Sequence, residues 1–178
     1  GTKMKAEQHP PDGTSTATGP DDGLVFNLEV SMSVQHMNAV RRFVAELAQS
    51  VVGDVELASR LALAAHELLE NAVKYSVNPR HLVTLRLAMA ARRHVRVTVM
   101  NASNEAMMGP LRALIRQLNE AEDRSAHYQE MIRRSMERDT GSGLGLARIS
   151  AEGEMHLSCE LRRGVLAVTA EAKIGGEP

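Results

Sequence analysis

Residues 66–76 read HELLENAVKYS, a stretch in which apolar periodicity and a convergent set of polar side chains share one predicted helix. At about 100° per residue, Glu67, Asn71 and Lys74 fall within an arc of roughly 60°. The opposite side of the helix is apolar and consists of Leu61, Ala65, Leu68, Leu69 and Ala72. One face is therefore predicted to be core and the other to carry chemistry, because a carboxylate, an amide oxygen and an ammonium at this spacing can hold Mg²⁺, water and phosphate together.

A simpler interpretation makes these polar residues an exposed helix face. Glu67 and Glu70 would then pair with Lys74, which stabilises a helix by only about 0.2–0.5 kcal/mol per pair. A second stretch, residues 140–149 with the sequence TGSGLGLARI, favours the functional interpretation. Its glycines lead into a short predicted helix over residues 144–151.

Together the two stretches resemble the signature boxes of the histidine kinase-like (GHKL) ATPase superfamily, and the first is most similar to that of the bacterial anti-sigma factor serine kinases. The resemblance implies that Glu67 is a general base or orienting group, that Asn71 binds Mg²⁺ and that Lys74 contacts phosphate. It assigns phosphate binding to the glycine stretch, at Gly141, Ser142, Gly143, Leu144 and Gly145. The implied cofactors are ATP and Mg²⁺.

The chain departs from this family at the adenine-binding box. The family carries Asp-x-Gly-x-Gly after the second strand, and its Asp accepts from the adenine amino group, whereas residues 101–105 here read NASNE. Asn101 takes the adenine position with a neutral amide, and a buried mismatch of this kind costs about 1–3 kcal/mol. ATP binding is therefore expected to be weakened or lost.

The order of predicted elements defines the fold class. Apolar spacing predicts helices and alternation predicts strands, in the order strand 24–30, helices 37–52 and 55–76, hairpin 82–89 and 94–100, helices 111–138 and 144–151, and hairpin 155–161 and 165–170. Gly53 and Asp54 are expected to separate the first two helices, and Pro79 to stop the second. The sequence predicts an α+β fold, a two-layer α/β sandwich with a mostly antiparallel, mixed sheet covered on one face by helices. The resemblance spans about 140 residues of it, Val34 to Ile174.

The length of 178 residues and the 43% hydrophobic composition suit one domain with a tail. Residues 1–22 are rich in Pro, Gly, Thr and Asp, and we expect a disordered tail with a tag remnant. Residues 23–178 are expected to form a single ATPase-like domain, with a helical lid over about residues 105–139.

Composition excludes several classes of function. The net charge is −1 and the chain has two Phe, two Tyr and no Trp, so little is available for binding nucleic acid. The single cysteine, Cys159, reads as a core thiol in a reducing compartment. No apolar run reaches the roughly 18 residues of a membrane span, and the N-terminus lacks the apolar centre of a signal peptide, so we expect a cytoplasmic protein and no membrane partner.

Two function classes remain open. The first is a bacterial regulatory protein resembling the anti-sigma serine kinases, an ATP-dependent protein serine/threonine kinase or switch that acts on a separate protein such as an anti-sigma antagonist or sigma factor. The second is a nucleotide-poor pseudo-ATPase that serves as an interaction module. It would use residues 111–138 to grip a partner or a second copy of the chain, in which case a homodimer is expected.

Overall fold

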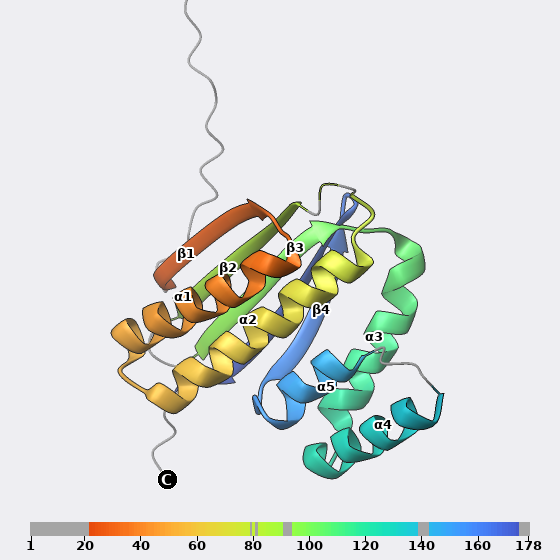
Figure 1. Ribbon diagram of the computed structural model, residues 1–178. Helices are drawn as coiled ribbons and strands as arrows, with labels where there is room; N and C mark the ends of the chain where they lie inside the picture. The colour runs from red at the N-terminus through yellow and green to blue at the C-terminus, as the bar shows by residue number, and fades with distance from the viewer. Residues whose placement is uncertain (1–21, 79, 81, 91–93, 139–142, 175–178) are drawn as a thin grey trace, which may run out of the picture.

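A computed structural model describes residues 22–78, 80, 82–90, 94–138 and 143–174 of the chain. The predicted tail of residues 1–22 lies outside the described residues except for Asp22, which begins the first strand. The elements run in the order shown in Figure 1: β1 (Asp22–Ser31), α1 (Val34–Val52), α2 (Val55–Tyr75), β2 (Leu82–Ala90), β3 (His94–Ala102), α3 (Glu105–Glu120), α4 (Arg124–Arg138), α5 (Leu144–Ala151), β4 (His156–Arg162) and β5 (Val165–Lys173).

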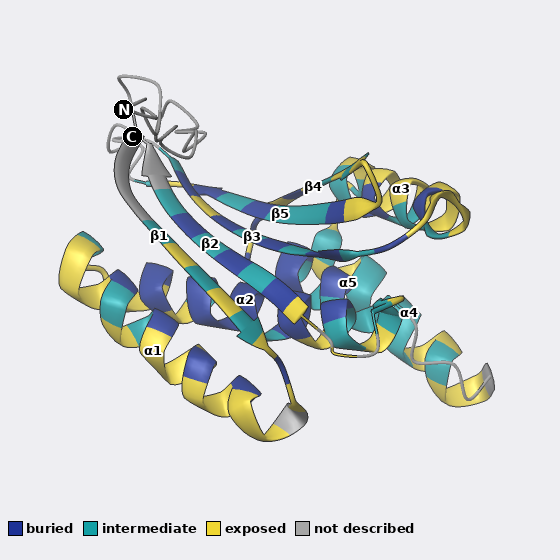
Figure 2. Cartoon of the chain, turned by 90° about the horizontal axis from the view of Figure 1, so that it is seen from above, coloured by how far each residue is buried: buried dark blue, intermediate teal, exposed yellow. Residues whose placement is uncertain are grey.

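The strands form one five-stranded sheet in the order β1-β2-β3-β5-β4. All pairings among the described strands are antiparallel, so the predicted parallel component of a mixed sheet is not present in this part of the chain. Helices α1, α2 and α5 lie against one face of the sheet, and α3 runs beside β4 (Figure 2). The predicted two-layer α/β sandwich is confirmed, with β1 as the predicted edge strand.

The junction between α1 and α2 follows from local chemistry. Gly53 adopts φ 73°, a left-handed conformation that glycine tolerates, and its N–H donates to Gln49 O at 2.9 Å. The Asp54 carboxylate accepts from Leu57 N at 3.0 Å and caps the next helix. Both predicted boundaries are confirmed, and the short turn sets α2 beside α1 across the sheet.

The core lies between these helices and the inward-facing side of the sheet. Alternation along β2 and β3 turns Leu85 and Val97 inward, and both are fully buried. The predicted apolar face of α2 packs against them, with Leu61, Ala65, Leu68, Leu69 and Ala72 all buried. Because this face is fixed in the core, the polar set of α2 is directed along its flank toward α5.

The single long helix predicted over residues 111–138 is wrong, because the structure has two helices. Helix α3 begins at Glu105 and runs through Pro110, whose missing N–H removes only one hydrogen bond near the N-terminus. The chain then breaks before Asp123, whose carboxylate accepts from Ala126 N at 2.8 Å and caps α4. Apolar periodicity continues across this break and therefore does not reveal where α3 ends. The break is marked by the Asp123 cap, which starts a second helix.

Cys159 is half-buried on β4 and packs against the core, as predicted for the position of its thiol. Burial raises the pKa of its thiol, and Arg112 opposes that shift. Among the described residues, no helix is both long enough and apolar enough to cross a bilayer.

Candidate functional site

A cavity of about 240 Å³ opens between α2, the central strands, α3 and the start of α5. Its walls are mainly apolar, and its polar side chains are two asparagines and a tyrosine. The lining residues that matter most to the site are Asn71, Tyr75, Asn101, Leu114, Gly143 and Leu146. Two of the predicted site residues of α2 and β3 therefore meet the described end of the glycine stretch around one space.

Glu67 lies at the side of this site and is only 8% exposed. Its Oε1 accepts from Arg148 Nη1 of α5 at 3.1 Å, so the simpler interpretation in which it pairs with Lys74 is wrong. Arg148 Nε also donates to Glu152 Oε2 at 2.8 Å, and this bond is the main cause that raises the pKa of the guanidinium. A buried carboxylate is thus held by an arginine from a helix remote in sequence.

Asn71 follows Glu67 by one helical turn and lines the cavity. Its Nδ2 is buried and has no hydrogen-bond partner in the described structure. A Cβ added at Gly145 would stand 2.6 Å from Glu67 Oε2 and 3.6 Å from Asn71 Nδ2. A side chain at residue 145 would therefore displace the Glu67 carboxylate, and glycine lets α5 approach the polar face of α2 this closely without that shift.

Lys74 is exposed and lies outside the cavity walls. Its Nζ stands 5.2 Å from the centroid of the Tyr75 ring, a cation–π distance. Tyr75, in contrast, lines the cavity. Solvent exposure thus increases along the predicted polar arc of α2, from the buried carboxylate of Glu67, through Asn71, to the exposed ammonium of Lys74 at the helix end.

Asn101 is the second-last residue of β3, lines the cavity and is 5% exposed. Its Nδ2 donates to Ala102 O at 3.1 Å. Ala102 O also accepts from Val77 N at 3.2 Å, so the amide nitrogen of Asn101 belongs to a local backbone junction. The carboxamide oxygen is the group that Asn101 retains for a ligand.

The glycine stretch is described from Gly143 onward, and Gly141 and Ser142 lie outside the described residues. Gly143 adopts φ 88° directly before α5, whose bounds match the predicted helix. A Cβ on Gly143 would stand 2.8 Å from Leu114 Cδ2 and 3.7 Å from Met131 Cε. Leu144 and Gly145 form the first turn of α5, and the predicted lid helices α3 and α4 pack against its start.

Two site residues were not selected from the sequence. Arg148 stands within the glycine stretch, but its spacing from Glu152 is that of an ordinary surface pair along a helix. Tyr128 of α4 lies near the same group, and its pKa is raised by burial first and then by the charges of Glu152 and Glu67, while Arg148 lowers it. Only the folded arrangement of α2, α4 and α5 reveals these neighbours.

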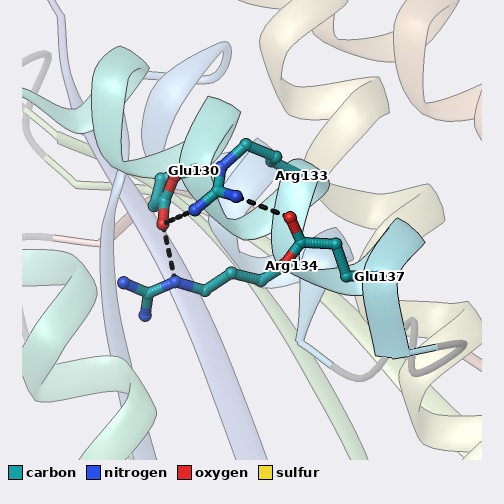
Figure 3. A network of polar contacts seen from close by, with 4 residues as sticks. All are labelled: Glu130, Arg133, Arg134 and Glu137. Atoms are coloured by element: carbon teal, nitrogen blue, oxygen red, sulfur yellow. Dashed lines mark hydrogen bonds and ion pairs between the residues drawn. The ribbon is translucent and has the colours of Figure 1, made fainter.

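The outer side of α4 carries an exposed charge network, drawn in Figure 3. Glu130 accepts from Arg133 and Arg134, and Arg133 also donates to Glu137 at 2.6 Å. The two arginine hydrogen bonds lower the pKa of Glu130 to about 2. Met131 directly follows Glu130 in the sequence and lies on a neighbouring face of the helix, so α4 joins a solvated charged face to the apolar contact on Gly143.

The donor set fits Mg²⁺ and a polyphosphate. A carboxamide oxygen is a ligand that Mg²⁺ accepts, and Asn71 carries one beside the first turn of α5. The buried amide nitrogen of Asn71 has no hydrogen-bond partner in the described structure, and as a donor it could be satisfied by a phosphate oxygen. The apolar cavity behind it suits the flat face of a base.

A comparison with protein families matches the chain to the histidine kinase-like ATPase domain over residues 30–152. Among solved structures, a chain of the SiaB–SiaC complex from Pseudomonas aeruginosa is similar, with a TM-score of 0.64 and 18% identity, over 86% of this chain and 91% of that one. That likeness shows the shared fold. A search of curated proteins finds no match. The family match spans more than half of the sequence, and the chain belongs to the histidine kinase-like ATPase domain family.

Proposed function

We propose that this chain is a regulatory protein of the cytoplasm that binds ATP with Mg²⁺ between α2, α3 and α5 and acts on a separate protein partner. Family membership supports nucleotide binding at this place in the fold. The similar solved chain was crystallised as a SiaB–SiaC complex, which supports a protein partner here too. The proposed partner class is that of the anti-sigma serine kinases, an anti-sigma antagonist or a sigma factor.

The observation that carries the proposal is the buried, unpartnered amide nitrogen of Asn71 beside Glu67 and Gly145. A buried N–H donor without a hydrogen bond is costly in a domain that has no use for it. Its position, at the junction of a cavity and a helix N-terminus, is where a metal-bound phosphate needs oxygen and N–H groups. A purely structural role leaves this arrangement unexplained.

The proposed chemistry is phosphoryl transfer to a hydroxyl of the partner protein. ATP with Mg²⁺ supplies the phosphoryl group and part of the charge stabilisation when bound. Asn71 Oδ1 would bind the metal, the N–H groups of Leu144 and Gly145 would bind phosphate, and Lys74 would approach it from the solvent side. Glu67 would orient or deprotonate the attacking hydroxyl, provided that one of its oxygens is free of Arg148.

A second function, an interaction module with little or no nucleotide binding, is favoured by a specific contact. Leu114 packs on Gly143, and the cavity wall is mostly apolar, so the start of α5 is covered by an apolar side chain and the cavity offers few polar groups to a nucleotide. The amide nitrogen of Asn101 also donates to Ala102 O and is therefore engaged within the protein. In this alternative α3 and α4 dock a partner or a second copy.

Thermal unfolding in MgATP, MgADP, ATP with EDTA, and adenosine tests the two functions. A ligand at a hundredfold over its dissociation constant stabilises by about 2.7 kcal/mol, which is readily measured. Stabilisation by MgATP that requires the metal supports the nucleotide-binding function. No stabilisation by any of the four ligands, at millimolar concentration, contradicts it and supports the interaction module. Size-exclusion chromatography of the same samples reports whether a homodimer forms.

A further inference from the structure

The ion pair between Glu67 and Arg148 links α2 and α5, the two helices that carry the polar groups of the site. Glu67 comes from α2 and Arg148 from α5, and the pair joins them at 3.1 Å. A carboxylate that is 8% exposed is costly unless a cation or donors compensate it. Arg148 is the cation that compensates it in the described part of the chain.

Arg148 is itself held in a defined orientation. Its Nε bonds Glu152 Oε2, and its Nη1 bonds Glu67 Oε1, so two edges of one planar guanidinium face two carboxylates. Tyr128 of α4 packs near the same group and senses the charges of Glu152, Arg148 and Glu67. The guanidinium therefore has little freedom to turn toward the cavity.

The other carboxylate oxygen of Glu67, Oε2, lies where it would repel an anionic ligand. Oε2 faces Gly145, in the first turn of α5, close enough that a Cβ there would stand 2.6 Å away. A polyphosphate on the N–H groups of this turn would approach a buried negative charge. Such repulsion is strong in a site shielded from water unless a fixed cation neutralises the carboxylate.

We propose that Arg148 is a positioning residue that neutralises and orients Glu67, so that a nucleotide polyphosphate can occupy the first turn of α5. The inference rests on the proposed nucleotide-binding function. Arg148 acts through Glu67 and does not contact the phosphate. The ligand class that depends on it is a nucleoside polyphosphate, whereas a nucleoside without phosphates does not depend on it.

The test is a binding cycle by calorimetry on the full chain, with MgATP and adenosine as ligands. Arg148→Gln should weaken MgATP by about tenfold, because it leaves Glu67 unpaired beside the phosphates, and should change adenosine affinity by less than about twofold. Glu67→Gln combined with Arg148→Gln should recover most of the MgATP affinity, because no buried charge remains. Arg148→Lys should fall between wild type and Arg148→Gln, since lysine keeps the charge but lacks the planar fork.

Arg60→Gln is the matched control. Arg60 is also an arginine bonded to the end of α5, through Gly153 O at 2.6 Å, but it does not contact Glu67. The control removes one positive charge and should leave the ratio of MgATP to adenosine affinity unchanged. A fall in that ratio equal to that of Arg148→Gln would mean that general charge, and not the pair, governs binding, and would overturn the inference.

Four other results also overturn it. Equal losses for MgATP and adenosine in Arg148→Gln would mean a general structural role. A double variant as weak as Arg148→Gln would mean that Arg148 contacts phosphate directly. If the wild-type protein binds neither ligand, the proposed function and the inference both fail. If the wild-type protein binds MgATP and Arg148→Gln does not alter that binding, the inference alone fails. If Arg148→Gln fails to fold, Arg148→Lys and the double variant decide, because neither leaves an unpaired buried carboxylate.

Discussion

Leu114 of α3 packs directly onto Gly143, so that a Cβ on this glycine would stand 2.8 Å from Leu114 Cδ2. Gly143 also adopts φ 88°, a conformation that costs a non-glycine residue roughly 1–2 kcal/mol. Two separate requirements, one of backbone and one of space, therefore select glycine at this position. The predicted lid helix α3 and the glycine stretch meet at the contact between Leu114 and Gly143.

Gly143→Ala is expected to lower the free energy of unfolding through both effects. Leu114→Ala in the same background should restore the steric part but not the backbone part, giving a coupling of about 0.5–3 kcal/mol in the double-mutant cycle. Urea unfolding of the four proteins measures it. Additive effects would mean that the two residues are not in contact.

Asn71→Ala should abolish the stabilisation by MgATP and leave the free protein nearly as stable as wild type, because Asn71 Nδ2 has no partner to lose. Asn119→Ala is the matched control. Asn119 donates to Leu157 O at 2.7 Å and accepts from Leu157 N at 3.1 Å, so its loss should destabilise the protein but spare the MgATP response. Thermal unfolding with and without MgATP separates the two patterns, and an Asn71→Ala protein that melts early would make Asn71 structural.

Asn101→Asp should tighten adenine nucleotides by about tenfold, the equivalent of one hydrogen bond worth roughly 1.4 kcal/mol. It should also destabilise the free protein, because a carboxylate cannot donate to Ala102 O as the amide does. Ser103→Ala is a neighbouring control, since its buried hydroxyl has no partner in the described structure and its loss should leave affinity unchanged. Unaltered affinity in a folded Asn101→Asp protein would show that this position does not face a base.

Hydrogen exchange should divide the predicted lid into two parts. Helix α3 buries Met108, Ile115 and Leu118 and should be protected with or without nucleotide. Helix α4 has no fully buried residue among those described and should gain protection only when MgATP is added. Exchange measured over residues 105–138 tests this division, and protection of α4 that ignores MgATP would favour the interaction module.

The fall in the free energy of unfolding at alkaline pH should depend on Tyr128. Its folded pKa is raised above 10.0, mainly by burial and then by Glu152, so the unfolded chain ionises first as the pH rises. Stability from this group is complete below about pH 10 and is lost as the pH rises through the higher folded pKa. Tyr128→Phe should show a shallower fall between about pH 9 and 11 in chemical unfolding. Identical slopes for the two proteins would place the phenol in water.

Local chemistry made much of the fold predictable. Gly53 and Asp54 define the turn between α1 and α2 through one backbone bond and one side-chain cap, and both signals are readable within a few residues. The start of α5 after Gly143 was predictable for the same reason. The break before Asp123 was not, because apolar periodicity continues across it and a capping aspartate looks like any other surface charge.

The site was predictable only where its residues share one element. Glu67, Asn71 and Lys74 lie on one helix, and their common face follows from the helical repeat. The pairing of Glu67 with Arg148 joins residues from different helices, and no periodicity carries that information. Position in the fold also decided exposure, which leaves Lys74 in solvent and Glu67 buried.

The order of strands has a consequence for how the molecule forms. Strands β2 and β3 pair across a short connection, but β5 pairs with β3 through contacts such as His94 with Lys173, with three helices between them in the chain. Closing so long a loop costs chain entropy before any contact is gained, so the β3–β5 ladder is expected to form late in folding. Asn71 and Asn101 precede α3 in the chain, and Gly143 and Arg148 follow α4. The proposed nucleotide site is thus assembled at the last step, and a refolding chain can have native β1–β3 structure before it can recognise any ligand.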